Sequence, residues 1–435
     1  MIAFLPFLVV ALALLGAVHW YVWRRLVRDV TAAGGPARRV GTAVVVALPL
    51  LSVAALASGR AGAPFLFQQV VAWPGFLWLA VLLYLVLALA VGEAVRPLLT
   101  RWLARRAAAT PAPATVPVPA PAPVPVPERT AEAEPKAETE TEAEAESKTG
   151  DVVERPVASE VSRRLFVARV VGGAAAAAAA GTVANGAYGV LRGPRVKRVT
   201  VPLAKLPRAA HGYRIAVVSD IHLGPILGRA HSQRIVDAIN ATQPDLIAVV
   251  GDLVDGTVEN LGPAAEPLAR LRARHGSFFV TGNHEYFSGA DAWVDHVREL
   301  GMRPLRNERL EIPAGFDLAG VDDVAGESEG RGPDFARALG DRDRSRTAVL
   351  LAHQPVVIDD AVAHGVDLQL SGHTHGGQLW PGNLLAELAN PTVAGLERYG
   401  DTQLYVSRGA GAWGPPVRVG APSDITVVQL ASKQA

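Results

Sequence analysis

The sequence predicts an α/β domain in the C-terminal half of the chain, preceded by α-helical transmembrane segments in the N-terminal half. Before residue 200 the apolar residues stand in long unbroken runs, whereas after it they alternate with charged residues, glycines and turn residues. The first pattern suits lipid and the second suits a soluble core. A chain of 435 residues is also too long for one ordinary domain.

Residues 1–106 are predicted to form a membrane region with about three transmembrane helices. Ile2–Trp23 is long enough to cross a bilayer, and Val40–Ala57 and Trp73–Val91 are the next apolar runs. A cleaved signal peptide is disfavoured, because no basic residues precede the first run and further runs follow it.

Arginines predict the orientation of these helices. They crowd the connection after the first run and the segment after the third, whereas residues 58–72 carry Arg60 alone. Because short cytoplasmic loops are enriched in Lys and Arg, the N-terminus is expected outside and the segment after Val91 in the cytoplasm.

Residues 107–161 are predicted to be a disordered linker, rich first in Pro and Ala and then in Glu. A fourth hydrophobic segment, 162–191, begins with the pair Arg163–Arg164, which resembles a twin-arginine export signal. The alternative is a plain membrane helix with two cytoplasmic arginines. Both readings deliver the C-terminal domain, residues 200–435, to the outer side. Four basic residues just beyond the segment oppose this orientation: Arg192, Arg195, Lys197 and Arg198.

Five short apolar runs are predicted to be buried strands, and each ends just before a polar cluster. They are Arg214–Ser219, Leu246–Val250, Ser277–Val280, Ala348–Leu351 and Leu368–Leu370. Helices are predicted at Arg229–Thr242 and Pro263–Arg274. Open α/β sheets place their ligands at the carboxyl ends of strands, so the polar clusters are the candidate site.

Each cluster taken alone has a plain structural explanation, such as an Asp that caps a helix or a satisfied buried His. In an extended chain, residues two apart point to the same side, so Asp220 and His222 could grip one ion. Together the clusters hold five of the eleven histidines, and the chain has no cysteine. A ligand set of Asp, Asn and His favours Mn, Fe or Zn. Two such ions about 3.5–4 Å apart can clamp both oxygens of an in-line displacement.

The ordered motifs DIH, GDLVD, GNHE, His353 and GHTHGG resemble those of the calcineurin-like metallophosphoesterase family, over about Tyr213 to Leu430. The stretches GNHEYF, SGHTHGGQ and SRGAGAW…PPVR are most similar to its bacterial membrane-associated or exported branch. The resemblance implies a two-layered β-sandwich flanked by helices.

The resemblance also implies two divalent metal ions and a role for each site residue. One ion would be bound by Asp220, His222 and His375, the other by Asn283, His353 and His373, and Asp252 would bridge them. His284 would be catalytic, either stabilising charge on the phosphoryl group or protonating the leaving oxygen. Asp255 is expected to cap a loop or to orient the ligands, not to bind metal, and Glu285 is expected to orient them. Arg408 is a candidate phosphate contact.

The expected function is hydrolysis of phosphomonoesters or phosphodiesters by a membrane-anchored enzyme outside the cytoplasm, through a water activated by two metals. The location favours a lipid or cell-envelope substrate. No nucleic-acid partner is expected, because the C-terminal half has no long basic block. Two alternatives stay open: a non-catalytic metal-binding scaffold, and an accessory domain of a membrane transporter or sensor. The filled ligand positions favour an enzyme, and the scarcity of charge in the apolar runs favours an anchor.

Overall fold

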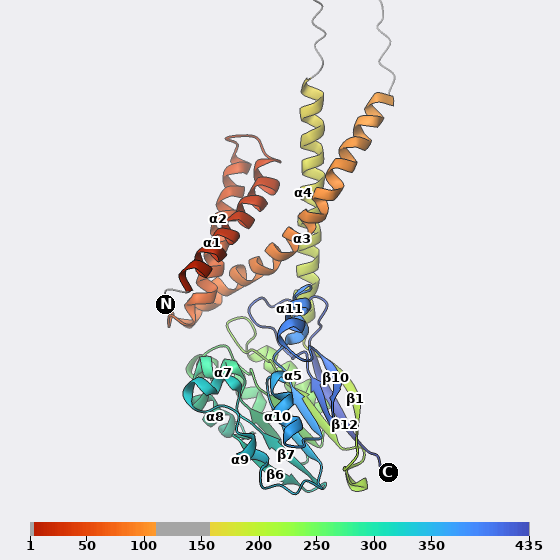
Figure 1. The fold of residues 1–435 in the computed structure, drawn as a ribbon. Coiled ribbons are helices and arrows are strands. Elements are labelled where there is room, and N and C mark those ends of the chain that lie inside the picture. The colour runs from red at the N-terminus through yellow and green to blue at the C-terminus, as the bar shows by residue number, and fades with distance from the viewer. Residues whose placement is uncertain (1–3, 110–156, 435) are drawn as a thin grey trace, which may run out of the picture.

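The computed structural model describes residues 4–109 and 157–434 (Figure 1). Most of the predicted linker therefore lies outside the described residues, as does the start of the first predicted run.

Four long helices form the described N-terminal part, and a π-helical turn at Arg24–Arg28 follows the first of them. They are α1 (Phe4–Trp23), α2 (Pro36–Ser58), α3 (Phe65–Ala109) and α4 (Val157–Leu191). Within the described residues, three helical stretches are long and apolar enough to cross a membrane: Pro36–Ser58, Phe65–Arg106 and Arg163–Leu191. The predicted apolar helices ahead of the α/β domain are thus confirmed. Helix α3, with 45 residues, is much longer than its predicted run, at roughly 68 Å for about 1.5 Å per residue.

The C-terminal part contains two six-stranded sheets. The first has the order β1-β12-β2-β3-β4-β5, and the second β10-β11-β9-β8-β7-β6. In the first sheet the strands are β1 (Arg195–Leu203), β12 (Asp424–Ser432), β2 (Arg214–Val218), β3 (Leu246–Val250), β4 (Ser277–Val280) and β5 (Arg303–Pro304). In the second they are β10 (Gly395–Tyr399), β11 (Thr402–Val406), β9 (Leu368–Ser371), β8 (Ala348–Leu351), β7 (Phe316–Gly320) and β6 (Glu308–Ile312).

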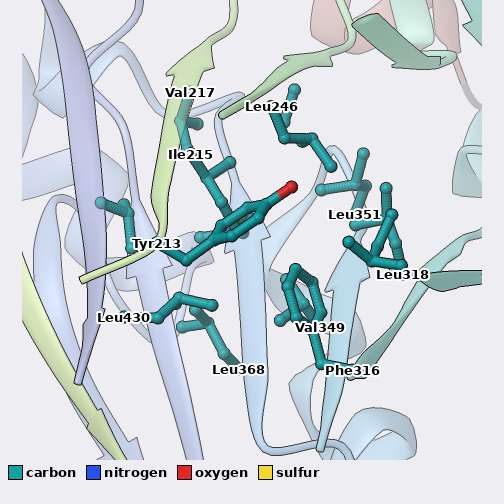
Figure 2. Packing of buried hydrophobic residues seen from close by; sticks show 14 of the residues in the cluster. Tyr213, Ile215, Val217, Leu246, Phe316, Leu318, Val349, Leu351, Leu368 and Leu430 are labelled. Carbon is teal, nitrogen blue, oxygen red and sulfur yellow. The ribbon is translucent and has the colours of Figure 1, made fainter. Parts of the chain in front are cut away.

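The two sheets pack face to face around a shared apolar core (Figure 2). In that core the ring of Tyr213 meets the ring of Phe316 edge-on, with centroids 5.1 Å apart. Apolar residues of β2, β3 and β4 lie against those of β7, β8 and β9. Each fully buried large side chain stabilises the fold by about 1.5–3 kcal/mol. The β-sandwich prediction is therefore confirmed.

Helices cover the outer face of each sheet, as predicted. The first sheet packs on α5 (Arg229–Ala241), α6 (Val258–Ala265) and α8 (Ala290–Glu299). The second packs on α9 (Phe335–Leu339) and α10 (Ile358–Ala363). Two further helices, α7 (Asn283–Ser288) and α11 (Gly382–Ala389), lie on the side toward the N-terminal helices (Figure 1).

The five predicted strands all form, within one residue of their predicted ends. The helix predicted at Pro263–Arg274 is wrong in its bounds, because α6 begins at Val258 and only a 3₁₀ turn continues it to Arg270. Pro267 has no N–H to bond to the fourth residue before it, which disfavours a further α-helical turn after α6.

The predicted boundary at residue 200 falls inside β1, which pairs in parallel with β12. Arg195, Lys197 and Arg198 therefore belong to the folded domain and do not form a loop beside the membrane. Helix α4 leads into β1 within four residues, from Leu191 to Arg195. The fourth apolar segment is thus joined directly to the sheet.

The N-terminal helices also contact the C-terminal domain away from this connection. Apolar residues of α3 and α4 pack together with Val417 of the domain. The hydroxyl of Tyr84 donates to the carbonyl oxygen of Trp380 at 3.0 Å. The carbonyl oxygen of Gly186 in α4 accepts from the backbone N–H of Arg418. These contacts fix one face of the domain toward the helices.

One histidine of α5 is expected to make the protein sensitive to acid. His231 is 1 % exposed, and within the described residues neither ring nitrogen has a hydrogen-bond partner. Burial, with the cations Arg234 and Arg418, lowers its pKa to about 3. In the unfolded chain the ring of His231 takes up a proton near pH 6.5, whereas in the folded protein it stays neutral down to about pH 3. The free energy of unfolding should therefore be unaffected by this group above pH 6.5. It should fall as the pH drops from 6.5 toward 3, by about 2 kcal/mol at pH 5.

His231→Leu should remove this part of the acid sensitivity, since the side chain no longer titrates. The check is thermal unfolding of the full chain in detergent at pH 7.5 and pH 5. Exposed His211 offers a matched control, because His211→Leu should behave like the wild type. An equal loss of stability in all three proteins would contradict the assignment.

Candidate metal centre

The polar clusters meet at one end of the sandwich, because the strands that precede them end there. Asp220 follows β2, Asp252 follows β3, and Asn283 opens α7 after β4. His353 follows β8, and His373 follows β9. The first three strands belong to one sheet and the last two to the other. The site therefore depends on the packing of both sheets.

One group of ligand atoms is formed by Asp220, His222 and His375, all within 4.8 Å of one another. Nε2 of His222 lies 3.0 Å from Nε2 of His375. The same His375 nitrogen lies 3.4 Å from Oδ1 of Asp220. Two imidazoles and a carboxylate that converge in this way are suited to a divalent transition metal.

A second group is formed by Asp252, His353 and His373, again within 4.8 Å. Oδ1 of Asn283 lies 3.0 Å from Nδ1 of His373, which places the amide beside this group. Nε2 of His353 lies 3.2 Å from Oδ2 of Asp252. The two histidines of the His-x-His motif thus belong to different groups.

Asp252 stands between the two groups. Its Oδ2 is 3.2 Å from Nε2 of His353 and 3.7 Å from Nε2 of His222. Its Oδ1 accepts the backbone N–H of His284 at 2.9 Å. A single carboxylate can therefore reach both ligand groups while the backbone fixes its rotamer.

The backbone at these residues is unusual. Among the described residues, five of the eight non-glycine residues with positive φ are site residues: Asp220 (51°), His222 (48°), Asp252 (53°), His373 (73°) and His375 (53°). The left-handed region costs a non-glycine residue of order 1 kcal/mol or more and is concentrated at functional sites. The expectation of an extended Asp-x-His segment is wrong, because the chain turns in the left-handed region directly after β2.

Two motif glycines leave room for the carboxylates. A Cβ on Gly282 would overlap Oδ1 of Asp252, and a Cβ on Gly372 would overlap Oδ2 of Asp220. Glycine is thus needed where the backbone of the third and fifth motifs lies against an acidic side chain of another motif.

Asp255 holds two histidines in place. Its Oδ1 accepts from Nδ1 of His222 at 2.9 Å and from Nδ1 of His284 at 2.7 Å. These contacts leave Nε2 of each ring available. The residue thus lies where the expected orienting role requires, since a carboxylate behind a ligating His fixes its tautomer and ring angle.

Asp255→Asn should lower both metal affinity and turnover by about 10–100-fold, because the neutral amide oxygen is a weaker acceptor for the two rings than the carboxylate oxygen. Metal titration followed by turnover at saturating metal separates the two losses. Asp295 on α8, which is exposed and pairs with Arg298, provides the matched control Asp295→Asn. Unchanged metal affinity in Asp255→Asn would contradict the orienting role.

Glu285 links two of the loops from below the site. Its fully buried carboxylate accepts the backbone N–H groups of Gly282 (2.6 Å), Leu253 (2.8 Å) and Asp252 (3.0 Å). Burial and the charge of Asp252 raise its pKa to about 7. The three donors favour its anion and hold the loops after β3 and β4 together.

The site gathers positive charge around its carboxylates. Burial alone would lower the pKa of His222, but Asp255, Asp252 and Asp220 outweigh it and raise that pKa to about 9. Burial is likewise outweighed at His353, where Asp252 raises the pKa well above its usual value. The carboxylates of the site thus favour positive charge at these two positions, which suits a bound cation.

The other two histidines are held neutral, as metal ligands must be. Burial and the charge of His353 lower the pKa of His373 to about 4. Burial, His222 and Arg418 hold the pKa of His375 well below its usual value.

Arg418, the last residue of the PPVR stretch, is a site neighbour to which the sequence assigned no role. This buried guanidinium donates to the carbonyl oxygen of His375 at 2.9 Å, and its Nη2 lies 3.1 Å from Nδ1 of the same ring. Because Arg only donates, Nδ1 accepts here and Nε2 carries the ring proton. Ligation of a metal through Nε2 requires this side-chain contact to break, while the bond to the carbonyl can persist.

The residues present fit divalent metals. Nε2 of His353 is buried and makes no well-aligned hydrogen bond within the described residues, although Nδ1 bonds the carbonyl oxygen of Val250 at 2.9 Å. An orphaned buried nitrogen is costly unless it has another partner. With carboxylate, amide and imidazole donors and no thiolate, the groups suit Mn, Fe or Zn.

Arg408 lies away from the cavity that adjoins His284, and its guanidinium faces Asp424 at 3.9 Å. Its side chain packs near Gly376. The phosphate-binding role of Arg408 stays a prediction.

Comparisons with known proteins find relatives that are named metallophosphoesterases. The calcineurin-like phosphoesterase family matches residues 213–377. A transmembrane protein with metallophosphoesterase domain from Danio rerio is 39% identical over 298 residues, which are 65% of this chain and 65% of that protein. An uncharacterized metallophosphoesterase from Helicobacter pylori strain J99 is 39% identical over 252 residues, or 57% of this chain and 67% of that protein. Another, from Aquifex aeolicus, is 36% identical over 243 residues, or 55% of this chain and 92% of that protein. The match spans less than two thirds of the Danio rerio protein.

Proposed function

Because this chain belongs to the calcineurin-like phosphoesterase family, we propose that its C-terminal domain hydrolyses phosphoesters with the help of two divalent metal ions. One observation carries the proposal: two convergent ligand groups share the carboxylate of Asp252. Asp220, His222 and His375 would hold one ion. Asn283, His353 and His373 would hold the other.

When bound, such a pair of ions would activate a water molecule and neutralise the phosphate oxygens. The protein supplies the rest. Asp252 keeps its carboxylate between the two groups, and the N–H of His284 fixes one of its oxygens. Asp255 lies 2.7 Å from Nδ1 of His284, which leaves Nε2 of that ring to protonate a leaving oxygen or to stabilise charge on the phosphoryl group.

Metal removal tests the proposal directly. The full chain, purified in detergent and stripped with a chelator, should lose turnover of bis(p-nitrophenyl) phosphate and p-nitrophenyl phosphate. Adding back Mn²⁺, Fe²⁺ or Zn²⁺ should restore it, and comparing the two substrates assigns diester or monoester preference. Full activity in the stripped protein, or none with any of these ions, would overturn the proposal.

We further propose that the phosphoesterase domain lies outside the cytoplasm. The α1–α2 connection and the C-terminal end of α3 lie at the ends of the helices remote from this domain (Figure 1). Those regions carry the arginine clusters, whereas the short α2–α3 connection near the domain carries Arg60. This distribution supports cytoplasmic arginines and an external domain. The twin-arginine signal at Arg163–Arg164 stays a prediction.

Protease accessibility tests this orientation. A protease added to spheroplasts should cut the domain, while a cytoplasmic marker protein stays intact. A domain that is protected until the membrane is opened would reverse the orientation.

A further inference from the structure

A cavity of about 200 Å³ joins the metal centre to the N-terminal helices. Its lining includes His222, Asp255 and His284 of the centre. It also includes Leu56 near the end of α2 and Phe65 at the start of α3. The two halves of the chain thus build this cavity together, and the C-terminal domain alone would leave it open.

Aromatic rings surround the candidate catalytic histidine at the cavity. The ring centroids of Phe287 and Trp413 lie 5.5 Å and 5.7 Å from that of His284. Both side chains are largely exposed, Phe287 by 64% and Trp413 by 52%. Exposed apolar rings beside a polar site are typical of a surface that binds an apolar group.

The cavity also contains a cation without an acidic partner. Arg60, in the α2–α3 connection, lines it and is exposed. Among the described residues, no carboxylate lies within ion-pair distance of its guanidinium. A cation here suits an anionic or polar group next to the apolar wall.

The same face of the domain carries further exposed apolar side chains. Leu384, Leu385 and Leu388 of α11 are exposed by 56%, 72% and 85%, and α11 lies near the lower end of α4 (Figure 1). Trp380, just before α11, is 54% exposed and is tied to α3 by Tyr84. If α2 and α3 cross a membrane, this face meets the lipid surface, since apolar helices and aromatic residues mark that boundary.

We infer that the substrate is an amphiphile, a phosphoester that carries an alkyl or acyl chain. This inference rests on the proposed function, in which the phosphoryl group lies beside His222 and His284. The alkyl or acyl chain of the substrate then lies along Leu56, Phe65 and Phe76, which line the same cavity. A small, fully polar phosphoester would leave this apolar wall uncovered.

Competition by alkyl phosphates tests this inference. Ethyl, butyl and hexyl phosphate would be compared as inhibitors of bis(p-nitrophenyl) phosphate turnover by the full chain in detergent with Mn²⁺. These short chains stay in water, so micelle binding does not imitate the effect. Inhibition should strengthen about two- to fourfold for each added methylene, as burial of a methylene predicts. Equal inhibition by all three, or stronger inhibition by adenosine monophosphate than by hexyl phosphate, would overturn the inference.

A pair of matched variants tests where the alkyl chain of the ligand binds. Phe65→Ser should remove most of the chain-length dependence while inhibition by inorganic phosphate stays unchanged. Phe67→Ser, two residues along the same helix at a position 49% exposed and outside the cavity lining, should keep it. Leu56→Gln replaces Phe65→Ser if the latter folds poorly. Full chain-length dependence in the cavity variants would contradict the assignment.

A binding measurement separates this inference from the proposed function. Hexyl phosphate with a photoreactive diazirine at the chain end should label residues between Leu56 and Phe76. Excess hexyl phosphate should block labelling, and hexanol should not. Labelling without any turnover would contradict the phosphoesterase proposal but support the ligand class. Turnover without labelling that excess hexyl phosphate blocks would contradict the ligand class but support the phosphoesterase proposal.

Discussion

Asp252→Ala is expected to abolish metal-dependent turnover, with kcat/KM falling by about 10³-fold or more. The carboxylate lies within 3.2 Å of His353 and 3.7 Å of His222, so its loss removes a donor from both ligand groups at once. Metal content measured by elemental mass spectrometry should drop from two ions per chain to one or none. The kcat/KM and the metal content are measured on the same purified protein in detergent.

The exposed carboxylate of Asp237 on α5 provides the matched control. Asp237→Ala should keep two ions and wild-type turnover. An Asp252→Ala protein that still binds two ions and turns over substrate at the wild-type rate would rule out the bridging role.

His284→Ala is expected to lower turnover by about 10²–10⁴-fold, the usual contribution of a positioned acid–base group. Metal content should stay unchanged, because His284 contacts Asp252 through its backbone N–H, which alanine retains. This combination distinguishes His284 from the ligands. His296, which pairs with Glu299 on α8, gives the matched control His296→Ala.

The leaving group decides which role His284 plays. If His284 protonates the leaving oxygen, the loss should be larger for a phenyl ester than for a p-nitrophenyl ester, because phenolate is the poorer leaving group. Equal losses would assign the side chain to charge stabilisation on the phosphoryl group. Loss of metal from His284→Ala would contradict both roles.

Most residues of the candidate site could be predicted from the sequence, because they lie in short local motifs. Asp220, Asp252 and His353 directly follow apolar runs that became β2, β3 and β8, within two residues. Such strands are buried on both faces and so read as continuous apolar runs. The motif glycines Gly282 and Gly372 were visible too, although their contact with the acidic side chains was not.

Other features had no local signal. β7 is fully buried but contains Asp317 and Gly320, which disfavour strand in isolation. The left-handed conformation of Asp220 and His222 cannot be read from residue type, since tertiary contacts hold a strained backbone in place. Arg418 reaches His375 from 43 residues along the chain.

The sequence by itself determined the division of the chain, the sandwich domain and the identity of the ligand candidates. The division follows from apolar run length, whereas the sandwich and the ligand candidates follow from the resemblance that the ordered motifs carry. Only the tertiary structure decided which ligands share a group, that one carboxylate lies between them, and that Asp255 serves two histidines. It alone brought α2 and α3 to the metal centre. These are distances between segments far apart in the chain, and they are set by how two sheets and the apolar helices pack.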